Sequence, residues 1–303
     1  MSRFKKSELD SLRDYISIDE EPEGDYQILR TYKTPTQRIA VVDEEGDILI
    51  YSNGHQMFGT TSDERRFAEA VVHAPMAATR SRRNVLIIGG GGGITTCEVL
   101  RYADVEHVST LDIDDVMINF GKKLKPLVKF NEGSLNHPKV KTVIEDGRKF
   151  LENNHAKWDV IIVDLPEPTV RNPSLSRLFS VEFYRLLKER LQPGGAISVA
   201  CSTADSTPEY LWSIYNTLGQ AGFYVSPYHY IEHEDAEDWL FCLGSTTPIR
   251  VNTLRMKVNA KYTTTERLRN MFRLPYYLVV SRHKGKVQTD QNTVLVDITN
   301  KVF

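Results

Sequence analysis

The sequence has few cysteines and no long apolar segment. Only three cysteines occur in 303 residues, Cys97, Cys201 and Cys242, and they are isolated from one another in the sequence. This pattern argues against a disulfide scaffold and a zinc site, and it is typical of the reducing cytoplasm. No segment approaches the roughly 20 consecutive apolar residues of a membrane-spanning helix. The residues MSRFKKSELDSLRDY lack the apolar core of a secretory signal. We therefore expect a cytoplasmic chain with neither a metal nor a membrane partner.

The composition is that of a globular protein with an uneven distribution of charge. Hydrophobic residues make up 41% and charged residues 26% of the chain, which leaves little room for a disordered or fibrous protein. Residues 246–303 contain 11 Lys and Arg against 3 Asp and Glu, a net charge of +8, so that residues 1–245 carry −10. An acidic body attracts cationic ligands. For the basic end we favour a solvated surface over a nucleic-acid contact.

The order of apolar runs predicts two sheets. Between residues 26 and 58, short β-prone runs separated by turn formers predict a small antiparallel sheet with hairpins. From residue 84 onwards, apolar β-branched runs alternate with helix-forming stretches, which predicts an α/β, Rossmann-like domain with a parallel sheet covered on both faces. Beyond residue 245 we expect one helix, TTERLRNMF, and two strands, YYLVVS and NTVLVDI. The predicted division is a lead-in (1–24), a small β-domain with a linking helix (25–78), the Rossmann-like catalytic domain (79–245) and a basic C-terminal extension (246–303).

A glycine-rich loop and acidic strand ends indicate a ligand site. The predicted strand 85–88 leads into five glycines, 89–93, and then into a helix. Glycines let the backbone approach a ligand closely at a helix N-terminus. The GxGxxG pattern is incomplete, because Ile94 replaces its third glycine. No lysine follows the loop, which excludes a P-loop.

Carboxylates follow the next three predicted strands. Asp112 comes roughly 20 residues after the glycines, where a carboxylate binds ribose hydroxyls. Asp146, with Gly147, ends the third strand, where a carboxylate can accept from an adenine amino group. This set fits a nucleoside without phosphates better than NAD. The fourth strand ends in the turn Asp164-Leu-Pro-Glu167-Pro, whose prolines keep two acids in place as a base or as ligands of an amine.

These motifs resemble the spermidine synthase (polyamine aminopropyltransferase) family over about residues 25–245, and in particular the branch whose catalytic turn reads D-L-P-[DE]-P. The matching pieces, in order, are Tyr26-Gln27, Asn53-Gly54-His55, Asp63-Glu64, Ile87 to Gly91, Asp112-Ile113-Asp114, Glu145-Asp146-Gly147, Asp164 to Pro168, Leu178-Phe179-Ser180 with Phe183-Tyr184, Pro193-Gly194-Gly195, and Tyr262-Thr263 followed by Met271-Phe272.

The resemblance implies transfer of an aminopropyl group from decarboxylated S-adenosylmethionine to an amine, and usually a homodimer. It further implies that Gln27 and Asp112 hold the ribose region, that Asp146 and Gly147 hold the adenine, and that Asp164 accepts the proton. Gly89 and Gly91 would belong to the donor site, and Glu167 would orient the amine. An alkylammonium has a pKa near ~10, so the attacking nitrogen must first lose a proton to a base. No metal is required for this chemistry.

The chain departs from the family at three places. Phe67-Ala68-Glu69 replaces the family's tyrosine-histidine-glutamate, which leaves Glu69 as the acid predicted to contact the amine. Gly92 replaces the aspartate that binds the donor's terminal ammonium. Glu167 replaces an aspartate. Because an aspartate at position 92 would repel a donor that keeps its carboxylate, the glycine leads to a hypothesis of relaxed donor choice.

A further acidic stretch precedes Trp239. Residues 232–238 contain five acids, and Glu234, Asp235 and Trp239 are predicted to bind a polyamine or another cationic acceptor, although a solvated loop is the more conservative interpretation. Two alternatives stay open: a transferase that moves the aminocarboxypropyl or methyl group of intact S-adenosylmethionine, and a catalytically silent nucleoside-binding homologue. The sequence does not identify the acceptor amine.

Overall fold

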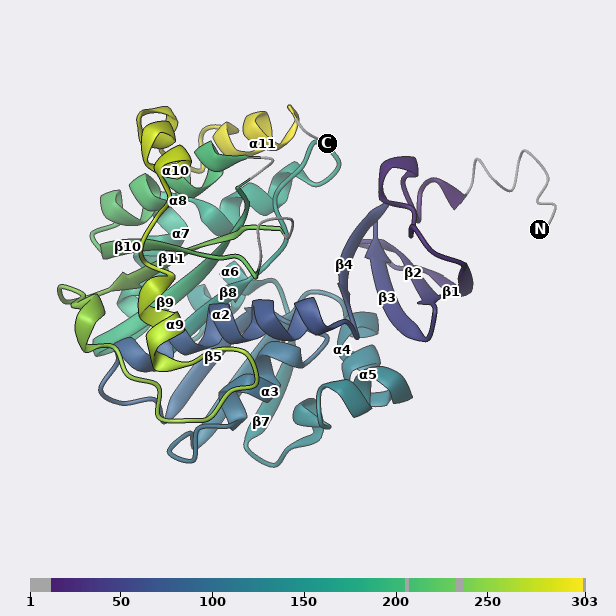
Figure 1. Ribbon diagram of the computed structural model, residues 1–303, viewed down its shortest axis with the longest axis horizontal. Coiled ribbons are helices and arrows are strands. Elements are labelled where there is room, and N and C mark those ends of the chain that lie inside the picture. The colour runs from purple at the N-terminus through teal and green to yellow at the C-terminus, as the bar shows by residue number, and fades with distance from the viewer. Residues whose placement is uncertain (1–11, 205–206, 233–236, 302–303) are drawn as a thin grey trace.

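The computed structural model describes residues 12–204, 207–232 and 237–301, which form two sheets (Figure 1). The smaller sheet is antiparallel, as predicted, and its strands pair in the order β1-β2-β3-β4. Its two tight turns contain Glu45-Gly46 and Asn53-Gly54, all four with positive φ, which matches the twist of short hairpins. The strands are β1 (Tyr26–Lys33), β2 (Arg38–Glu44), β3 (Asp47–Ser52) and β4 (His55–Gly59).

The larger sheet has seven strands in the order β10-β11-β9-β8-β5-β6-β7. Its five parallel strands confirm the predicted Rossmann-like domain, while the antiparallel strands β10 and β11 at one edge were not predicted. The strands are β5 (Asn84–Gly89), β6 (His107–Asp112), β7 (Val140–Ile144), β8 (Trp158–Asp164), β9 (Leu191–Thr203), β10 (Tyr224–Tyr230) and β11 (Trp239–Ser245).

Helices connect and cover the strands, and none within the described ranges is long and apolar enough to cross a membrane. The α-helices are α2 (Ser62–Ala78), α3 (Ile94–Leu100), α4 (Asp115–Lys123), α5 (Lys125–Phe130), α6 (Gly147–Asn153), α7 (Val181–Arg190), α8 (Pro208–Gln220), α9 (Thr265–Asn270), α10 (Tyr276–Val280) and α11 (Val294–Thr299). The 3₁₀ turns are η1 (Ile18–Glu20), η2 (Ser134–Asn136), η3 (Pro173–Phe179), η4 (Val251–Thr253) and η5 (Ser281–Lys284).

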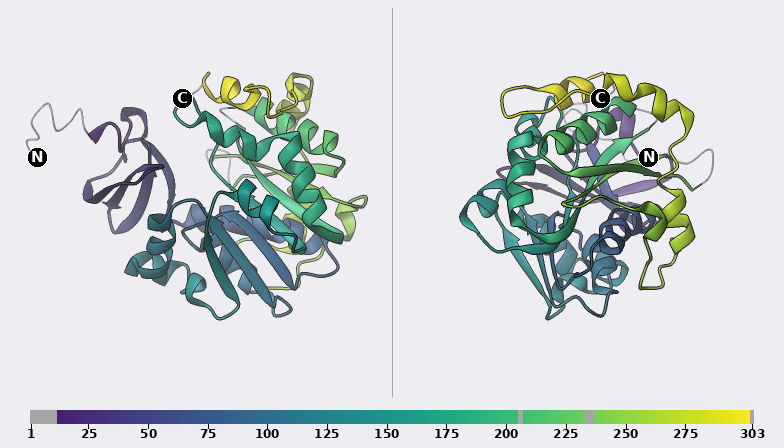
Figure 2. Two further views of the ribbon diagram at one scale, coloured as in Figure 1. Left: turned by 180° about the vertical axis from the view of Figure 1, so that it is seen from behind. Right: turned by 90° about the vertical axis from the view of Figure 1, so that its left-hand side faces the viewer.

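Strand alternation buries both faces of the larger sheet. Along β5, Leu86 and Ile88 pack with residues of α6, α7 and α8, whereas Val85 and Ile87 pack with residues of α2 and α3. Figure 2 shows helices on both sides of this sheet. A parallel sheet that is covered in this way leaves the carboxyl ends of its strands as the place for a ligand.

The small sheet is held against the larger domain by apolar and polar contacts. Ile39 and Ile50 of the small sheet share a core with Met117 and Phe120 of α4. Beside this core, Asp114 is 2% exposed and caps α4 by accepting the N–H of Val116 through Oδ1. Its Oδ2 accepts hydrogen bonds from the β1–β2 turn, namely from Thr34 Oγ1, Thr36 Oγ1 and Gln37 Nε2 at 2.6, 2.8 and 3.0 Å.

Asp114→Asn is expected to loosen this junction. The amide keeps a cap on α4 but turns an NH₂ group toward three donors, so the free energy of unfolding should fall by about 2 kcal/mol, the order expected for lost bonds to a buried charged group. Denaturant unfolding measures the change. Asp115→Asn, one residue along and exposed, is the matched control and should leave stability nearly unchanged. Equal stability of the two variants would contradict the role of Asp114.

The two strands predicted near the C-terminus are wrong. The segment YYLVVS forms α10 and NTVLVDI forms most of α11. In α10 only Leu278 is buried, and the exposed residues are Tyr276, Tyr277, Val279 and Val280. The apolar run therefore packs through one side chain and does not bury alternate residues as a strand would. The Trp212 Nε1–H of α8 donates to the carbonyl of Leu278 at 2.8 Å. The C-terminal segment therefore covers α8, as Figure 1 shows in yellow.

Candidate active site

The glycine loop packs against the end of β8. Gly89, Gly90 and Gly93 have φ values of 90°, 71° and 80°, which favour glycine. A Cβ on Gly89 would lie 1.9 Å from the carbonyl oxygen of Asp164, so only glycine fits there. A Cβ on Gly90 would lie 3.2 Å from Oδ2 of Asp164. The loop predicted to hold the donor therefore lies directly beside the predicted base.

Asp112 lies on the other side of the same loop. Its Oδ2 accepts the N–H of Gly91 at 3.1 Å, and its Oδ1 accepts the N–H of Asp114 at 3.0 Å. Burial, together with the charges of Asp114 and Asp164, raises the pKa of Asp112 to about 6, although the two N–H donors oppose the shift. The side chain is partly exposed, so a carboxylate is available where ribose hydroxyls were predicted to bind.

Asp146 follows β7 and begins α6. Its Oδ1 accepts the N–H groups of Arg148 and Lys149 at 3.1 and 3.0 Å, which makes it the N-cap. A Cβ on Gly147 would lie 2.9 Å from Cγ2 of Ile88, so the glycine allows α6 to pack closely on β5. The structure gives both residues a local role at the same edge of the sheet, and adenine binding stays a prediction.

Asp164 and Glu167 are both partly buried in the turn after β8. The Thr95 hydroxyl of α3 donates to Oδ2 of Asp164 at 2.5 Å. Burial raises the pKa of Asp164, and the Thr95 hydroxyl opposes the shift. Burial also raises the pKa of Glu167, against a hydrogen bond from Ser202 at the end of β9. A carboxylate with a raised pKa is a better proton acceptor than one in water.

Glu64 belongs to this group of acids although no role was predicted for it. It lies in the first turn of α2, where the backbone N–H of Gly59 donates to its carboxylate. Burial and the charge of Asp164, with a smaller contribution from Asp63, raise the pKa of Glu64 to about 8. The pair Asp63-Glu64 was a matching motif, but only the fold shows that the start of α2 faces the end of β8.

Glu64 should make the reaction with an amine pH-dependent. With a pKa of about 8, its carboxyl is expected to change from mostly neutral at pH 7 to mostly ionised at pH 9, so the attraction for an ammonium increases across this range. We expect the ratio of kcat/KM for the amine between the wild type and Glu64→Gln to rise roughly tenfold from pH 7 to 9, as one group ionises. The ratio cancels deprotonation of the amine itself. A ratio that is constant with pH would contradict this role.

The raised pKa of Glu64 also makes the stability of the protein depend on pH. The folded state binds more protons than the unfolded state between the ordinary pKa of 4.5 and about 8. The free energy of unfolding should therefore fall as pH rises through that window, and Glu64→Gln should remove this contribution.

Two predicted site residues lie elsewhere. Glu69, in the middle of α2, is fully buried, and its carboxylate accepts the N–H groups of Lys261, Tyr262 and Thr263 at 2.7–3.2 Å. It anchors the C-terminal segment, so the structure does not support a direct contact with the amine.

Gln27 is exposed on β1, the outermost strand of the small sheet, about 20 Å along that strand from its end at Lys33. The structure does not bring Gln27 to Asp112.

Trp239 lies at the start of β11, opposite Thr203 at the end of β9, and hence at the same edge as Glu167. Its ring stacks on Tyr230 and meets Phe67 edge-on, with centroids 6.2 and 5.8 Å apart. This aromatic group occupies the region where the family's tyrosine is replaced by Phe67.

The acids around Trp239 already have partners. Arg66 pairs with Glu232 at 2.5 Å, His229 pairs with Asp238 at 2.7 Å, and the Trp239 indole donates to Glu237 at 3.1 Å. Glu234 and Asp235, which were predicted to bind the amine, lie outside the described residues. Each described acid of this stretch therefore has a partner within the protein, which favours the more conservative interpretation of it.

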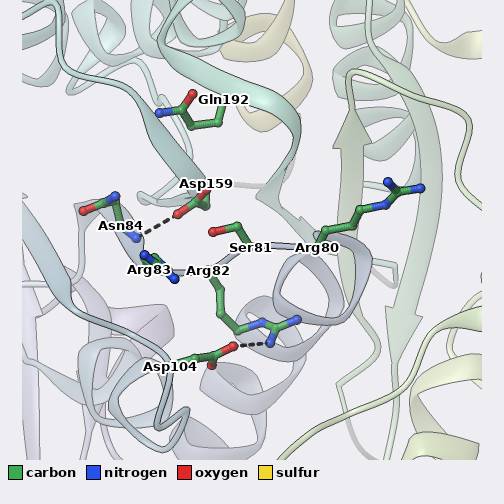
Figure 3. Close-up of a pocket in the computed structure, with 8 residues that line it drawn as sticks. All are labelled: Arg80, Ser81, Arg82, Arg83, Asn84, Asp104, Asp159 and Gln192. Carbon is green, nitrogen blue, oxygen red and sulfur yellow. Dashed lines mark hydrogen bonds and ion pairs between the residues drawn. The ribbon is translucent and has the colours of Figure 1, made fainter.

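Two cavities lie away from the group of acids. One, of about 560 Å³, lies at the amino ends of β5, β8 and β9, the opposite edge from Asp164 (Figure 3). Its polar groups bind one another: Arg82 pairs with Asp104 at 2.6 Å, and Asp159 accepts the N–H of Asn84 at 2.9 Å. The other, of about 380 Å³, lies between α8, β10 and the C-terminal segment. Neither is lined by Asp112 or Asp164.

The fold is that of an α/β protein, and its group of acids gathers at the carboxyl ends of the parallel strands, where such folds bind ligands. The model of the spermine/spermidine synthase domain matches residues 64–249. The chain is 36% identical over 223 residues to polyamine aminopropyltransferase 2 of Hyperthermus butylicus, covering 70% of this chain and 72% of that protein. The chain therefore belongs to the spermine/spermidine synthase family.

Other relatives are longer than this chain. It is 33% identical over 239 residues to the polyamine aminopropyltransferase of Oceanobacillus iheyensis, covering 79% of this chain but 46% of that protein. The chain spans about half the length of several curated relatives that it matches. Among solved structures, a spermidine synthase in complex with the transition state analogue AdoDATO has a TM-score of 0.75 at 23% identity, covering 85% of this chain and 88% of that chain. This likeness confirms the fold.

Proposed function

We propose that this chain transfers an aminopropyl group from decarboxylated S-adenosylmethionine to an amine and releases methylthioadenosine. The observation that carries the proposal is that Asp112 and Asp164 flank one glycine loop. The N–H of Gly91 donates to Asp112 at 3.1 Å, and a Cβ on Gly90 would lie 3.2 Å from Oδ2 of Asp164. One carboxylate is placed for the nucleoside and the other for the reacting nitrogen. Family membership supports the same chemistry, since relatives in this family are named polyamine aminopropyltransferases.

In the proposed reaction, Asp164 takes a proton from the ammonium of the acceptor. The freed nitrogen lone pair attacks the carbon next to the sulfonium, the new C–N bond forms, and the C–S bond breaks with its electrons on sulfur. The sulfur leaves as the neutral thioether of methylthioadenosine. Burial raises the pKa of Asp164 and so brings it closer to the pKa of the ammonium, which favours the proton transfer.

The acceptor is held by the remaining carboxylates in this proposal. Glu64 is close enough for the charge of Asp164 to raise its pKa, and Glu167 follows Asp164 in the same turn. A cation bound beside Asp164 and Glu64 lowers the cost of ionising both. Asp146, Gly147, Gly89 and Gly91 line the donor side, and Trp239 lines the acceptor side. The donor is a co-substrate, and the chemistry needs no metal. A homodimer in the cytoplasm completes the proposal and rests on the family resemblance.

Mass spectrometry of the products tests the proposal. The purified chain is incubated with either decarboxylated or intact S-adenosylmethionine and with a panel of diamines and polyamines. Methylthioadenosine together with an aminopropylated amine is the expected result. S-adenosylhomocysteine would instead mark methyl transfer, and binding of methylthioadenosine without any product would favour a silent homologue.

A further inference from the structure

Gly92 is glycine because of a neighbouring side chain and not because of its backbone. Its φ lies outside the positive range that the neighbouring Gly90 and Gly93 adopt. A Cβ at position 92 would instead lie 2.8, 3.1 and 3.1 Å from Cε2, Cδ2 and Cζ of Phe58. The ring of Phe58 therefore takes the space that a side chain at position 92 would need.

Both partners of this contact are held in place. The buried Nδ2 of Asn131 donates to the carbonyls of Gly92 and Gly121 at 2.8 Å each, which fixes the loop. Phe58 extends from β4 and packs against the apolar core that joins the small sheet to α4. Neither the loop nor the ring can move aside without breaking one of these contacts.

The position of the ring bears on the donor. Gly92 follows Gly91, whose N–H binds Asp112, and it precedes the start of α3, from which Thr95 reaches Asp164. Phe58 also precedes Gly59, whose backbone N–H donates to Glu64, and the charge of Asp164 raises the pKa of Glu64. The ring therefore belongs to the part of the molecule that the side arm of the proposed donor would approach. Phe58 presents a partly exposed, uncharged aromatic surface there.

We propose that Phe58 is a specificity-determining residue for the side arm of the donor. It replaces a charged contact at position 92 by an aromatic wall, so that the site distinguishes weakly between a donor with and a donor without the terminal carboxylate. The inference rests on the proposed function, because it assumes an adenosyl sulfonium donor at this loop.

The relative strengths of an aromatic and a charged contact predict how well the site distinguishes the two donors. An aromatic ring attracts a cation weakly, and it does so whether or not a carboxylate is also present. A hydrogen bond to a charged partner is stronger, and an unpaired like charge is repelled. We therefore expect the dissociation constants of the two donors to differ by less than about tenfold in the wild type, since 1.4 kcal/mol is a factor of ten.

A double-mutant cycle on the full chain tests the inference. Calorimetric titrations with methylthioadenosine, decarboxylated S-adenosylmethionine and S-adenosylmethionine are made on the wild type, Gly92→Asp, Phe58→Ala and the double variant. Gly92→Asp should lower the midpoint of thermal unfolding in the wild-type background, and it should lower the midpoint by less in the Phe58→Ala background, where the ring is absent. The double variant should then favour the decarboxylated donor more than tenfold over the wild-type ratio. Tyr276→Ala, which removes an exposed aromatic ring from α10, is the matched control and should leave the ratio unchanged.

The outcomes separate the two proposals. A wild type that binds methylthioadenosine but prefers the decarboxylated donor by more than tenfold overturns the role of Phe58 and leaves the proposed function intact. A double variant whose two donors bind with the same ratio of dissociation constants as in the wild type overturns the role of Phe58 as well. A wild type that does not bind methylthioadenosine counts against the proposed function itself. The clash between a side chain at position 92 and the ring of Phe58 can be tested without a ligand. Gly92→Ala should lower the stability of the protein, and adding Phe58→Leu should recover part of that stability.

Discussion

Asp164→Asn is expected to lower kcat by about 10³-fold, within the range that a positioned general base contributes. The amide has nearly the same shape and can still accept the Thr95 hydroxyl, but it cannot take the proton of the ammonium. Because Asp112 and the glycine loop are unchanged, binding of methylthioadenosine should be preserved. Single-turnover kinetics with a saturating amine, together with calorimetric titration of methylthioadenosine, measures both effects.

A matched control separates the loss of the base from the loss of an acid in general. Asp104→Asn alters an exposed acid at the opposite edge of the sheet and should leave kcat unchanged. Retention of more than a tenth of the wild-type rate by Asp164→Asn would place the proton acceptor elsewhere. Glu64 would then be the first residue to test.

The second large effect concerns Glu69. Glu69→Ala leaves the N–H groups of residues 261–263 without their acceptor inside the protein, and each unsatisfied buried group costs about 1–3 kcal/mol. We expect the free energy of unfolding to fall by about 3–5 kcal/mol, as when one partner of a buried charged network is removed. Denaturant unfolding measures this loss, and Glu266→Ala, an exposed glutamate in α9, is the control.

A second variant of Glu69 distinguishes a structural role from a role in binding the amine. If Glu69 only anchors the C-terminal segment, Glu69→Gln should leave the KM for the amine unchanged at a temperature where the variant is fully folded. A marked increase in the amine KM without a loss of stability would restore the role in substrate binding that the sequence suggested.

Features that depend on local patterns could be predicted from the sequence. The apolar β-branched runs predicted all five parallel strands, and the positions of Asp112, Asp146 and Asp164 at their ends followed directly. Asn53-Gly54 and Glu45-Gly46 predict the hairpin turns of the small sheet, and the structure has tight turns with positive φ at both.

Features that depend on packing between distant segments were missed. Glu64 becomes part of the site only because α2 starts beside β8, more than 90 residues away in the sequence. Glu69 looked like a site acid because of its motif, but its partners are backbone groups nearly 200 residues away. The run YYLVVS, residues 276–281, has the pattern of a strand, yet in the helix α10 that it forms only Leu278 is buried, beside Trp212.

The central claim is that an adenosyl sulfonium binds at the glycine loop with its arm toward Asp164, and a crystal structure of the full chain with methylthioadenosine tests it most directly. We expect the ribose hydroxyls within hydrogen-bonding distance of Asp112, the adenine beside Asp146 and the methylthio group directed at Asp164. A nucleoside bound at another edge, for example near Arg82 and Asp104, or a loop closed by its own side chains at saturating ligand, would contradict the account.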